Sequence, residues 1–157
     1  MKIGFGYDIH RITQKGPMFL GGVEVSIKNG LLGHSDGDVL LHAVSDAVLG
    51  ALSRGDIGSI FPDTDESIKG ISSVRILEKV SKIMREDGFR LGNLDCVVVA
   101  EEPRISSYRE KIASLISAVL FSTPENVSVK GKTKEGLGEV GEGQAIEAYA
   151  SVLLVKN

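Results

Sequence analysis

The N-terminal stretch of this chain places two very different sets of side chains on the two sides of one strand. Residues 2–10 alternate, and a period of two is typical of a β-strand. One side is apolar and consists of Ile3, Phe5, Tyr7 and Ile9. The other side carries two glycines followed by Asp8 and His10. We therefore expect a strand with its apolar side anchored in the core, while the glycines leave room on the opposite side.

Composition limits what the protein can bind and where it works. The chain of 157 residues is long enough to bury a substantial core as one domain, 1–157. The formal net charge of −3 gives no basic footprint for nucleic acid, and no apolar run approaches a signal peptide or a membrane span. Cys96 is the only cysteine, so no internal disulfide forms, and its apolar surroundings favour a buried residue over a reactive thiol. We expect a cytoplasmic protein that binds neither nucleic acid nor membranes.

Periodicity and turn residues predict the remaining elements. Strands are expected at 18–27 (a hairpin turning at Gly21 and Gly22), 93–101, 127–132 and 145–155. Helices are expected at 35–52, 73–87 and after Pro103, the first opening on an approximate capping box at 35–38 and the third on a capping box at 107–110. Glycine, proline and aspartate predict loops at 55–65 and 136–143. This order predicts a layered α/β (α+β) domain, with a mixed or antiparallel sheet packed on helices.

Three residues have the chemistry of a metal site. Asp8 and His10 are two positions apart on a strand and therefore project from the same side. His42 lies on the expected first helix, with Asp38 and Asp46 one turn to either side. A lone helical histidine is more often structural, and an aspartate and a histidine two apart are common by chance. Together, however, Asp8, His10 and His42 supply the three ligands of a catalytic zinc site with an open position.

A second polar zone lies at 130–136, where the sequence reads KGKTKEG. It invites interpretation as a Walker A phosphate loop, but Asn126 stands where that motif needs its first glycine, and a glycine-rich loop follows instead of a helix. We reject that interpretation. Two alternatives stay open: Lys132, Thr133 and Glu135 contact phosphates individually, or the segment is a solvated charged turn.

Taken together, these segments resemble the 2-C-methyl-D-erythritol 2,4-cyclodiphosphate synthase family of the non-mevalonate isoprenoid route. The matching blocks run in order along nearly the whole chain. They are GYDIHR (6–11), LGHSDGD (32–38) through His42, GDIG (55–58), FPDTD (61–65), AEEP (100–103), TKEGLG (133–138) and AI (145–146). Several blocks at matching separations are far more specific than any one of them.

The resemblance implies a metal-dependent phosphorus–oxygen lyase. Such an enzyme converts 4-diphosphocytidyl-2-C-methyl-D-erythritol 2-phosphate to 2-C-methyl-D-erythritol 2,4-cyclodiphosphate and releases CMP. It also implies a homotrimer with active sites between neighbouring subunits. Zn²⁺, or another divalent transition metal, would bind Asp8, His10 and His42, and Glu135 would ligate Mg²⁺ or Mn²⁺ on the diphosphate. His34 and Thr133 would stabilise the transition state.

The resemblance further implies two groups of substrate-binding residues. The first surrounds the metal and the sugar alcohol: Asp8, Ile9, His10, His34, Ser35, Asp56, Ile57, Gly58, Phe61, Pro62, Asp63, Thr64 and Asp65. The second holds the cytidine and diphosphate of the substrate at the adjacent subunit: Ala100, Glu101, Glu102, Pro103, Arg104, Ile105, Gly131, Lys132, Thr133, Lys134 and Glu135.

Four sites depart from the family's usual pattern. Ser72 stands where aspartate is common, and Gly131-Lys132 replaces a usual Ala-Thr pair. Glu139 and Glu142 stand where phenylalanine and arginine are usual. In the family these last two positions border a cavity on the trimer axis that in some members accepts a prenyl diphosphate. Carboxylates from three subunits would repel an anion there, so we expect that site to be lost.

Two other functions fit some of the same residues. The triad of Asp8, His10 and His42 could activate water in a zinc hydrolase, although the match to a nucleotide pocket argues against it. Alternatively, the chain could be a non-catalytic metal-binding trimer of the same fold, because a fold alone does not fix a function.

Overall fold

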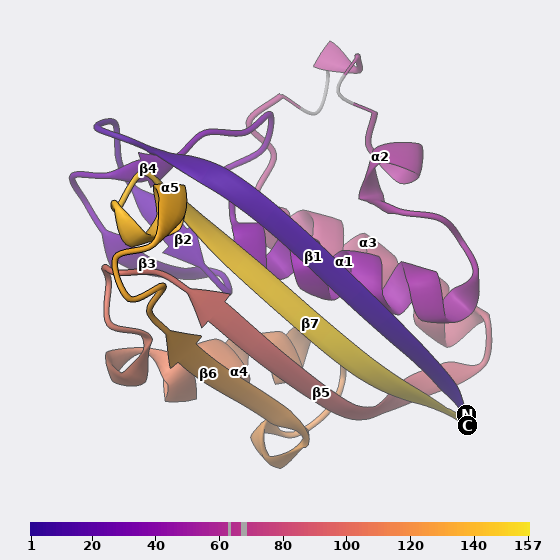
Figure 1. Ribbon diagram of the computed structural model, residues 1–157. Helices are drawn as coiled ribbons and strands as arrows, with labels where there is room; N and C mark the ends of the chain where they lie inside the picture. The colour runs from indigo at the N-terminus through magenta and orange to yellow at the C-terminus, as the bar shows by residue number, and fades with distance from the viewer. Residues whose placement is uncertain (63, 67–68) are drawn as a thin grey trace.

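The computed structural model describes residues 1–62, 64–66 and 69–157 (Figure 1). The first and the last strand of the chain are neighbours in one five-stranded sheet. The strands are β1 Lys2–Thr13, β2 Met18–Leu20, β3 Val23–Ser26, β4 Gly30–Leu31, β5 Phe89–Val99, β6 Val127–Lys132 and β7 Ala145–Lys156. The helices are α1 Val39–Leu52, α2 Ile57–Ile60, α3 Ser73–Glu86, α4 Arg109–Val119 and α5 Gly138–Gly141, with 3₁₀ turns η2 Ile105–Ser107 and η3 Pro124–Asn126.

The sheet is mixed, which confirms the predicted fold class. Its strand order is β4-β1-β7-β5-β6, and β5 with β6 is its parallel pair, while the pairings of β1 with β4, β1 with β7 and β5 with β7 are antiparallel. β2 and β3 form a separate hairpin that turns at Gly21 and Gly22, as predicted. Lys2 on β1 pairs with Leu154 on β7, so the chain termini lie side by side (Figure 1).

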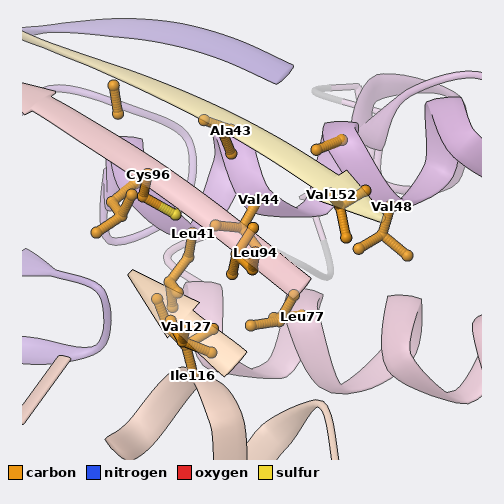
Figure 2. Packing of buried hydrophobic residues seen from close by; sticks show 14 of the residues in the cluster. Leu41, Ala43, Val44, Val48, Leu77, Leu94, Cys96, Ile116, Val127 and Val152 are labelled. Atoms are coloured by element: carbon orange, nitrogen blue, oxygen red, sulfur yellow. The ribbon is translucent and has the colours of Figure 1, made fainter. Parts of the chain in front are cut away.

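The core fills the space between the helices and one face of the sheet (Figure 2). Its members come from α1, α3, α4 and strands β5, β6 and β7, including Leu41, Val44, Val48, Leu77, Leu94, Ile116, Val127 and Val152. Cys96 is buried among them, as predicted, and burial raises the pKa of its thiol to about 12. No helix among the described residues is long and apolar enough to cross a membrane.

The orientation of β1 is the opposite of the sequence prediction. Ile3 is 76% exposed and Phe5 66% exposed, whereas the glycine side of the strand packs on α1. A Cβ at Gly6 would lie 1.9 Å from the carbonyl oxygen of Ala43, and one at Gly4 would lie 1.8 Å from that of Ala47. The alternation told which residues share a side but not which side is covered, and only glycine lets the helix backbone come this close.

The start of α1 also differs from the prediction. The N-cap is Asp38 and not Ser35: its side chain accepts a hydrogen bond from the backbone N–H of Leu41 at 3.0 Å. The same buried carboxylate accepts from the N–H groups of Gly21 and Gly22, at 2.9 and 2.7 Å. Burial raises the pKa of Asp38, while these backbone donors oppose that rise. Asp38 thus ties the β2–β3 hairpin to the first turn of the helix.

Other boundaries shift by less. The helix predicted at 73–87 is α3, followed by Gly88 at φ +79°, but β5 begins four residues earlier than predicted. The capping box predicted at 107–110 is wrong, because α4 begins after Tyr108 with no side-chain cap and residues 105–107 form η2. The two predicted loops contain short helices, α2 and α5, and Asp56 caps the first of these through the N–H of Ser59.

Candidate functional site

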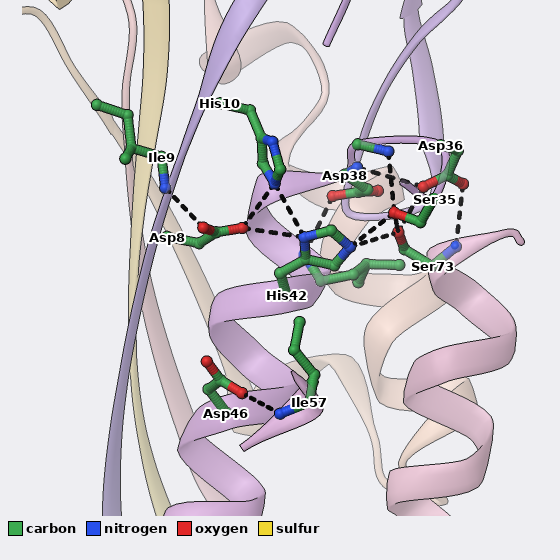
Figure 3. Close-up of polar contacts among 12 residues, drawn as sticks. Asp8, Ile9, His10, Ser35, Asp36, Asp38, His42, Asp46, Ile57 and Ser73 are labelled. Carbon is green, nitrogen blue, oxygen red and sulfur yellow. Dashed lines mark hydrogen bonds and ion pairs between the residues drawn. The ribbon is translucent and has the colours of Figure 1, made fainter. Parts of the chain in front are cut away.

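Three metal-type ligands meet where β1 lies on α1 (Figure 3). Asp8 Oδ2 lies 2.8 Å from His10 Nε2 and 2.9 Å from His42 Nδ1, and the two ring nitrogens are 3.1 Å apart. The three residues each offer a ligand atom within 4.8 Å of the others. The glycine side of β1 makes this possible, because it seats the strand directly on the helix that carries His42. The structure thus brings the predicted triad together.

The electrostatics of the triad suit a cation. Burial by itself raises the pKa of Asp8, but hydrogen bonds from His10 and His42 outweigh it and hold that pKa well below its usual range. Burial by itself lowers the pKa of His10, and the hydrogen bond to Asp8 outweighs it and raises that pKa. Asp8 is therefore an anion lying between two imidazoles. Two ring nitrogens and one carboxylate oxygen are a donor set that fits a divalent transition metal.

A cavity of about 250 Å³ opens beside the triad. Its walls are formed by Asp8, His10, Gly33, His34, Ser35, His42, Ile57, Gly58, Phe61, Ile71 and Ile76. Five further residues predicted from the resemblance, from His34 to Phe61, thus lie around the same space as the triad. Asp46 Oδ1 accepts a hydrogen bond from the N–H of Ile57 at 2.8 Å, which fastens the α2 wall to α1 one turn beyond His42.

Other predicted substrate contacts lie outside that wall. The Ile9 side chain points to the opposite side of β1, and its N–H donates to Asp8 Oδ1 at 2.9 Å. Asp56 accepts from the backbone and hydroxyl of Ser59 as the cap of α2, and these bonds lower its pKa. Phe61 lies on the cavity wall, whereas Pro62, Thr64 and Asp65, which follow it, do not. Asp63 lies outside the described residues.

A second cavity, of about 740 Å³, forms a groove between the segment after β5 and strand β6. It is lined by Ala100, Glu101, Glu102, Pro103, Arg104, Ile105, Ser106, Arg109, Val129, Lys130, Gly131, Lys132 and Thr133. The residues predicted to hold cytidine, 100–105 with 131–133, all lie here. Gly131 lets this segment approach closely, because a Cβ there would lie 2.8 Å from Cβ of Ile105 and one of the two would have to shift.

The segment just beyond the groove is held from two sides. The N–H of Lys134 donates to Glu101 Oε1 at 2.8 Å, and Lys134 Nζ lies 3.1 and 3.3 Å from the two carboxylate oxygens of Glu147 on β7. Thr133 Oγ1 donates to Glu135 Oε1 at 2.9 Å. Thr133 and Glu135 therefore share one side of the segment, while the ammonium of Lys134 is engaged with β7.

Sequence reasoning missed two residues at the metal triad, Asp36 and Ser73. Ser73 Oγ lies 3.0 Å from His42 Nε2, and the Ser73 hydroxyl makes a short hydrogen bond to Asp36 Oδ1 (Figure 3). These contacts join positions more than thirty residues apart, so local spacing does not reveal them. The neighbouring Ser72, a departure from the usual family residue, caps α3 by accepting from the N–H of Val74.

Comparison with known proteins agrees with this architecture. The model of the YgbB family matches residues 1–155. A 2-C-methyl-D-erythritol 2,4-cyclodiphosphate synthase of Pelotomaculum thermopropionicum is 48% identical, over 99% of this chain and 96% of that protein. The bifunctional IspDF of Campylobacter jejuni superposes with a TM-score of 0.95 at 36% identity, over 99% of this chain and 42% of that longer one. IspF of Plasmodium falciparum, solved as a CDP complex, gives 0.87 at 39% identity, over 99% and 96%.

Proposed function

This chain belongs to the YgbB family, and we propose from that membership that it is a 2-C-methyl-D-erythritol 2,4-cyclodiphosphate synthase. It converts 4-diphosphocytidyl-2-C-methyl-D-erythritol 2-phosphate to the cyclic diphosphate and releases CMP, in the non-mevalonate route to isoprenoids. One observation carries the proposal: a metal-type triad and a groove of nucleotide size occur together in a chain that is 43–48% identical, over its whole length, to synthases of that name. Residues 1–157 act as one catalytic domain, and we place the reaction in the cytoplasm.

Asp8, His10 and His42 are the residues that would hold a divalent transition metal, which we propose is Zn²⁺. Three protein ligands leave one position open, as is usual where zinc is catalytic. Bound there, the ion supplies Lewis acidity to a phosphate oxygen. We propose further that Glu135 holds Mg²⁺ or Mn²⁺ on the diphosphate, supported by its place directly beyond the groove and by its contact with Thr133.

The protein's part in the reaction is mainly to position the substrate. An oxygen of the substrate's own 2-phosphate attacks the β-phosphorus, and the bond to the CMP oxygen breaks with its electrons leaving on CMP. Phosphoryl transfer of this kind needs little covalent chemistry from the enzyme, and folding the substrate back on itself makes the attack intramolecular. We assign His34, on the wall of the metal cavity, and Thr133, at the end of the groove, to hydrogen bonds that stabilise charge on the phosphate oxygens.

The metal cavity and the groove are separate hollows of one chain, so a substrate that spans both needs them to be brought together. We propose a homotrimer in which the groove of one subunit adjoins the metal cavity of its neighbour. The exposed apolar side of β1 supports this assembly, since a row that includes Ile3 at 76% and Phe5 at 66% exposure is a typical buried surface of an oligomer. The cytidine-binding role of the groove is supported by the CDP complex of the Plasmodium falciparum relative.

A single reaction tests the proposal. The protein is given the cytidyl substrate with Zn²⁺ and Mg²⁺, and the products are followed by ³¹P NMR. We expect CMP and the cyclic diphosphate in equal amounts. Release of CMP with a linear phosphate product would instead identify a hydrolase. Metal binding without any turnover would identify a non-catalytic member of the family.

A further inference from the structure

We propose that Ser73 and Asp36 are positioning residues that hold the His42 ring through a hydrogen bond at Nε2, and so keep its Nδ1 turned toward the metal. The inference rests on the metal-binding part of the proposed function. It adds two residues outside the ligand triad to the machinery of the site, one from the loop before α1 and one from the first turn of α3.

The direction of the hydrogen bonds follows from the chemistry of the three groups. Asp36, as a carboxylate, can only accept, and it accepts from both the N–H of Ser73, at 3.0 Å, and the Ser73 hydroxyl. Because the hydroxyl proton of Ser73 is committed to Asp36, its oxygen meets His42 Nε2 as an acceptor at 3.0 Å. Nε2 of His42 is therefore the hydrogen-bond donor in this contact. Nδ1 of the same ring lies at the triad, 2.9 Å from Asp8 Oδ2, and is the nitrogen that would face a metal ion there.

His10 is also held at the ring nitrogen that faces away from the triad, but by a backbone carbonyl group. Its Nδ1 faces the carbonyl oxygen of Leu32, which accepts only, so Nδ1 donates to that oxygen and Nε2 faces the triad. The two imidazoles therefore use opposite nitrogens. His10 is set by the backbone, whereas His42 depends on side chains, and side chains can be replaced singly.

Ser35 also lies at hydrogen-bond distance from His42 Nε2 and could compete with Ser73 for it. Its Oγ lies 2.9 Å from His42 Nε2 and accepts a hydrogen bond from the N–H of Gly37 at 3.1 Å. Ser35, however, lies on the cavity wall, where a bound phosphate competes for its hydroxyl, whereas Ser73 is fully buried. The chain of hydrogen bonds from His42 through Ser73 to Asp36, called the relay below, therefore holds His42 whether or not the cavity is filled.

The test compares two buried serines of one helix. Ser73→Ala removes the relay, and Ser81→Ala is the matched control, because Ser81 is also buried on α3 but donates to the carbonyl oxygen of Val119. The Zn²⁺ affinity of each protein, free of substrate, is measured by competition with a chromophoric chelator. We expect Ser73→Ala to bind Zn²⁺ about tenfold more weakly than wild type, and Ser81→Ala to match wild type within about twofold.

A second readout does not involve metal. The chain has three histidines, so ¹⁵N NMR of the metal-free, histidine-labelled protein reports the protonated nitrogen of each ring. We expect a proton on Nε2 of His42 in wild type and in Ser81→Ala, and a lower fraction of rings with that proton in Ser73→Ala. Equal Zn²⁺ affinity and an equal fraction of His42 rings with that proton in the two serine variants would overturn the inference.

Asp36→Asn completes a double-mutant cycle with Ser73→Ala. If both residues act through one relay, the double variant binds Zn²⁺ no more weakly than Ser73→Ala alone, whereas independent effects would add and contradict the relay. All of these measurements are made without substrate. A wild-type protein that binds Zn²⁺ but releases no CMP would thus contradict the proposed function and leave the relay intact.

Discussion

The two hollows of the molecule are built in opposite ways. The wall of the metal cavity, of about 250 Å³, includes side chains already hydrogen-bonded to one another, Asp8 and His10 from a strand and His42 from a helix. Buried Ser73, from a second helix, contacts His42 from outside the wall. The groove, of about 740 Å³, is lined by one continuous segment, residues 100–106, lying against strand β6.

This difference corresponds to the size of what each hollow would hold. A metal ion interacts with a few atoms at fixed distances, so its ligands must be set before it arrives. A nucleotide contacts a long surface, and its binding site can be completed by a neighbouring chain. Changes at the metal cavity should therefore abolish function, whereas changes at the groove should weaken it by degrees.

The largest effect is expected at the triad. His42→Ala removes one of three ligands, so we expect loss of bound Zn²⁺ and a fall in CMP release of about a thousandfold, while the proposed trimer persists. Metal content by mass spectrometry, CMP release and light scattering measure the three properties. Full activity in a metal-free His42→Ala protein would show that the cavity is not the reaction centre.

Next comes the contact that creates the cavity. Gly6→Ala would place a Cβ 1.9 Å from the carbonyl oxygen of Ala43, so β1 must move away from α1. We expect a loss of about 3 kcal/mol in the free energy of unfolding, together with weaker Zn²⁺ binding. The control is Gly50→Ala, an exposed helix position whose Cβ would meet Phe5 O only at 3.9 Å and which should gain up to about 1 kcal/mol. Urea unfolding gives both values, and equal stability of the two variants would contradict this account.

A smaller effect is expected beside the groove. Glu147→Gln removes the charge that holds Lys134 Nζ, and so loosens the segment carrying Thr133 and Glu135. We expect the Mg²⁺ concentration for half-maximal activity to rise by about threefold, with unchanged Zn²⁺ content. Glu142→Gln, an exposed acidic residue that contacts Gln144, is the control. An unchanged Mg²⁺ dependence in Glu147→Gln would mean that the ion pair serves stability alone.

The last prediction is that a prenyl diphosphate leaves the melting temperature unchanged. Glu139 and Glu142 are exposed on and beside α5, where three copies would gather negative charge about the axis of the proposed trimer. We therefore expect farnesyl diphosphate to leave the melting temperature unchanged, measured by scanning calorimetry with CDP as a positive control. A saturable rise in melting temperature would show that the axial site has been kept.

The sequence predicted contacts that obey a local rule and missed those that do not. Asp8 and His10 could be paired because a strand has a period of two, but no such rule says that Ser73 lies against His42, 31 positions away. The cap of α1 was misplaced because the Ser35 hydroxyl serves Gly37 and His42, while Asp38 faces three backbone donors. The direction of β1 was missed because hydropathy assigns apolar residues to the core, whereas the close approach of α1 depends on the two glycines of the other side.

The pairing of the first strand with the last has a consequence for biosynthesis. Lys2 pairs with Leu154 and Asp8 with Ala148, so β1 has its main sheet neighbour only when the C-terminal residues have been synthesised. A chain still attached to the ribosome therefore holds Asp8 and His10 on a strand that lacks its β7 partner, a pairing of very high sequence separation. We therefore expect the triad to reach its final geometry only in the finished chain, and a truncated chain that lacks β7 to bind a divalent metal more weakly.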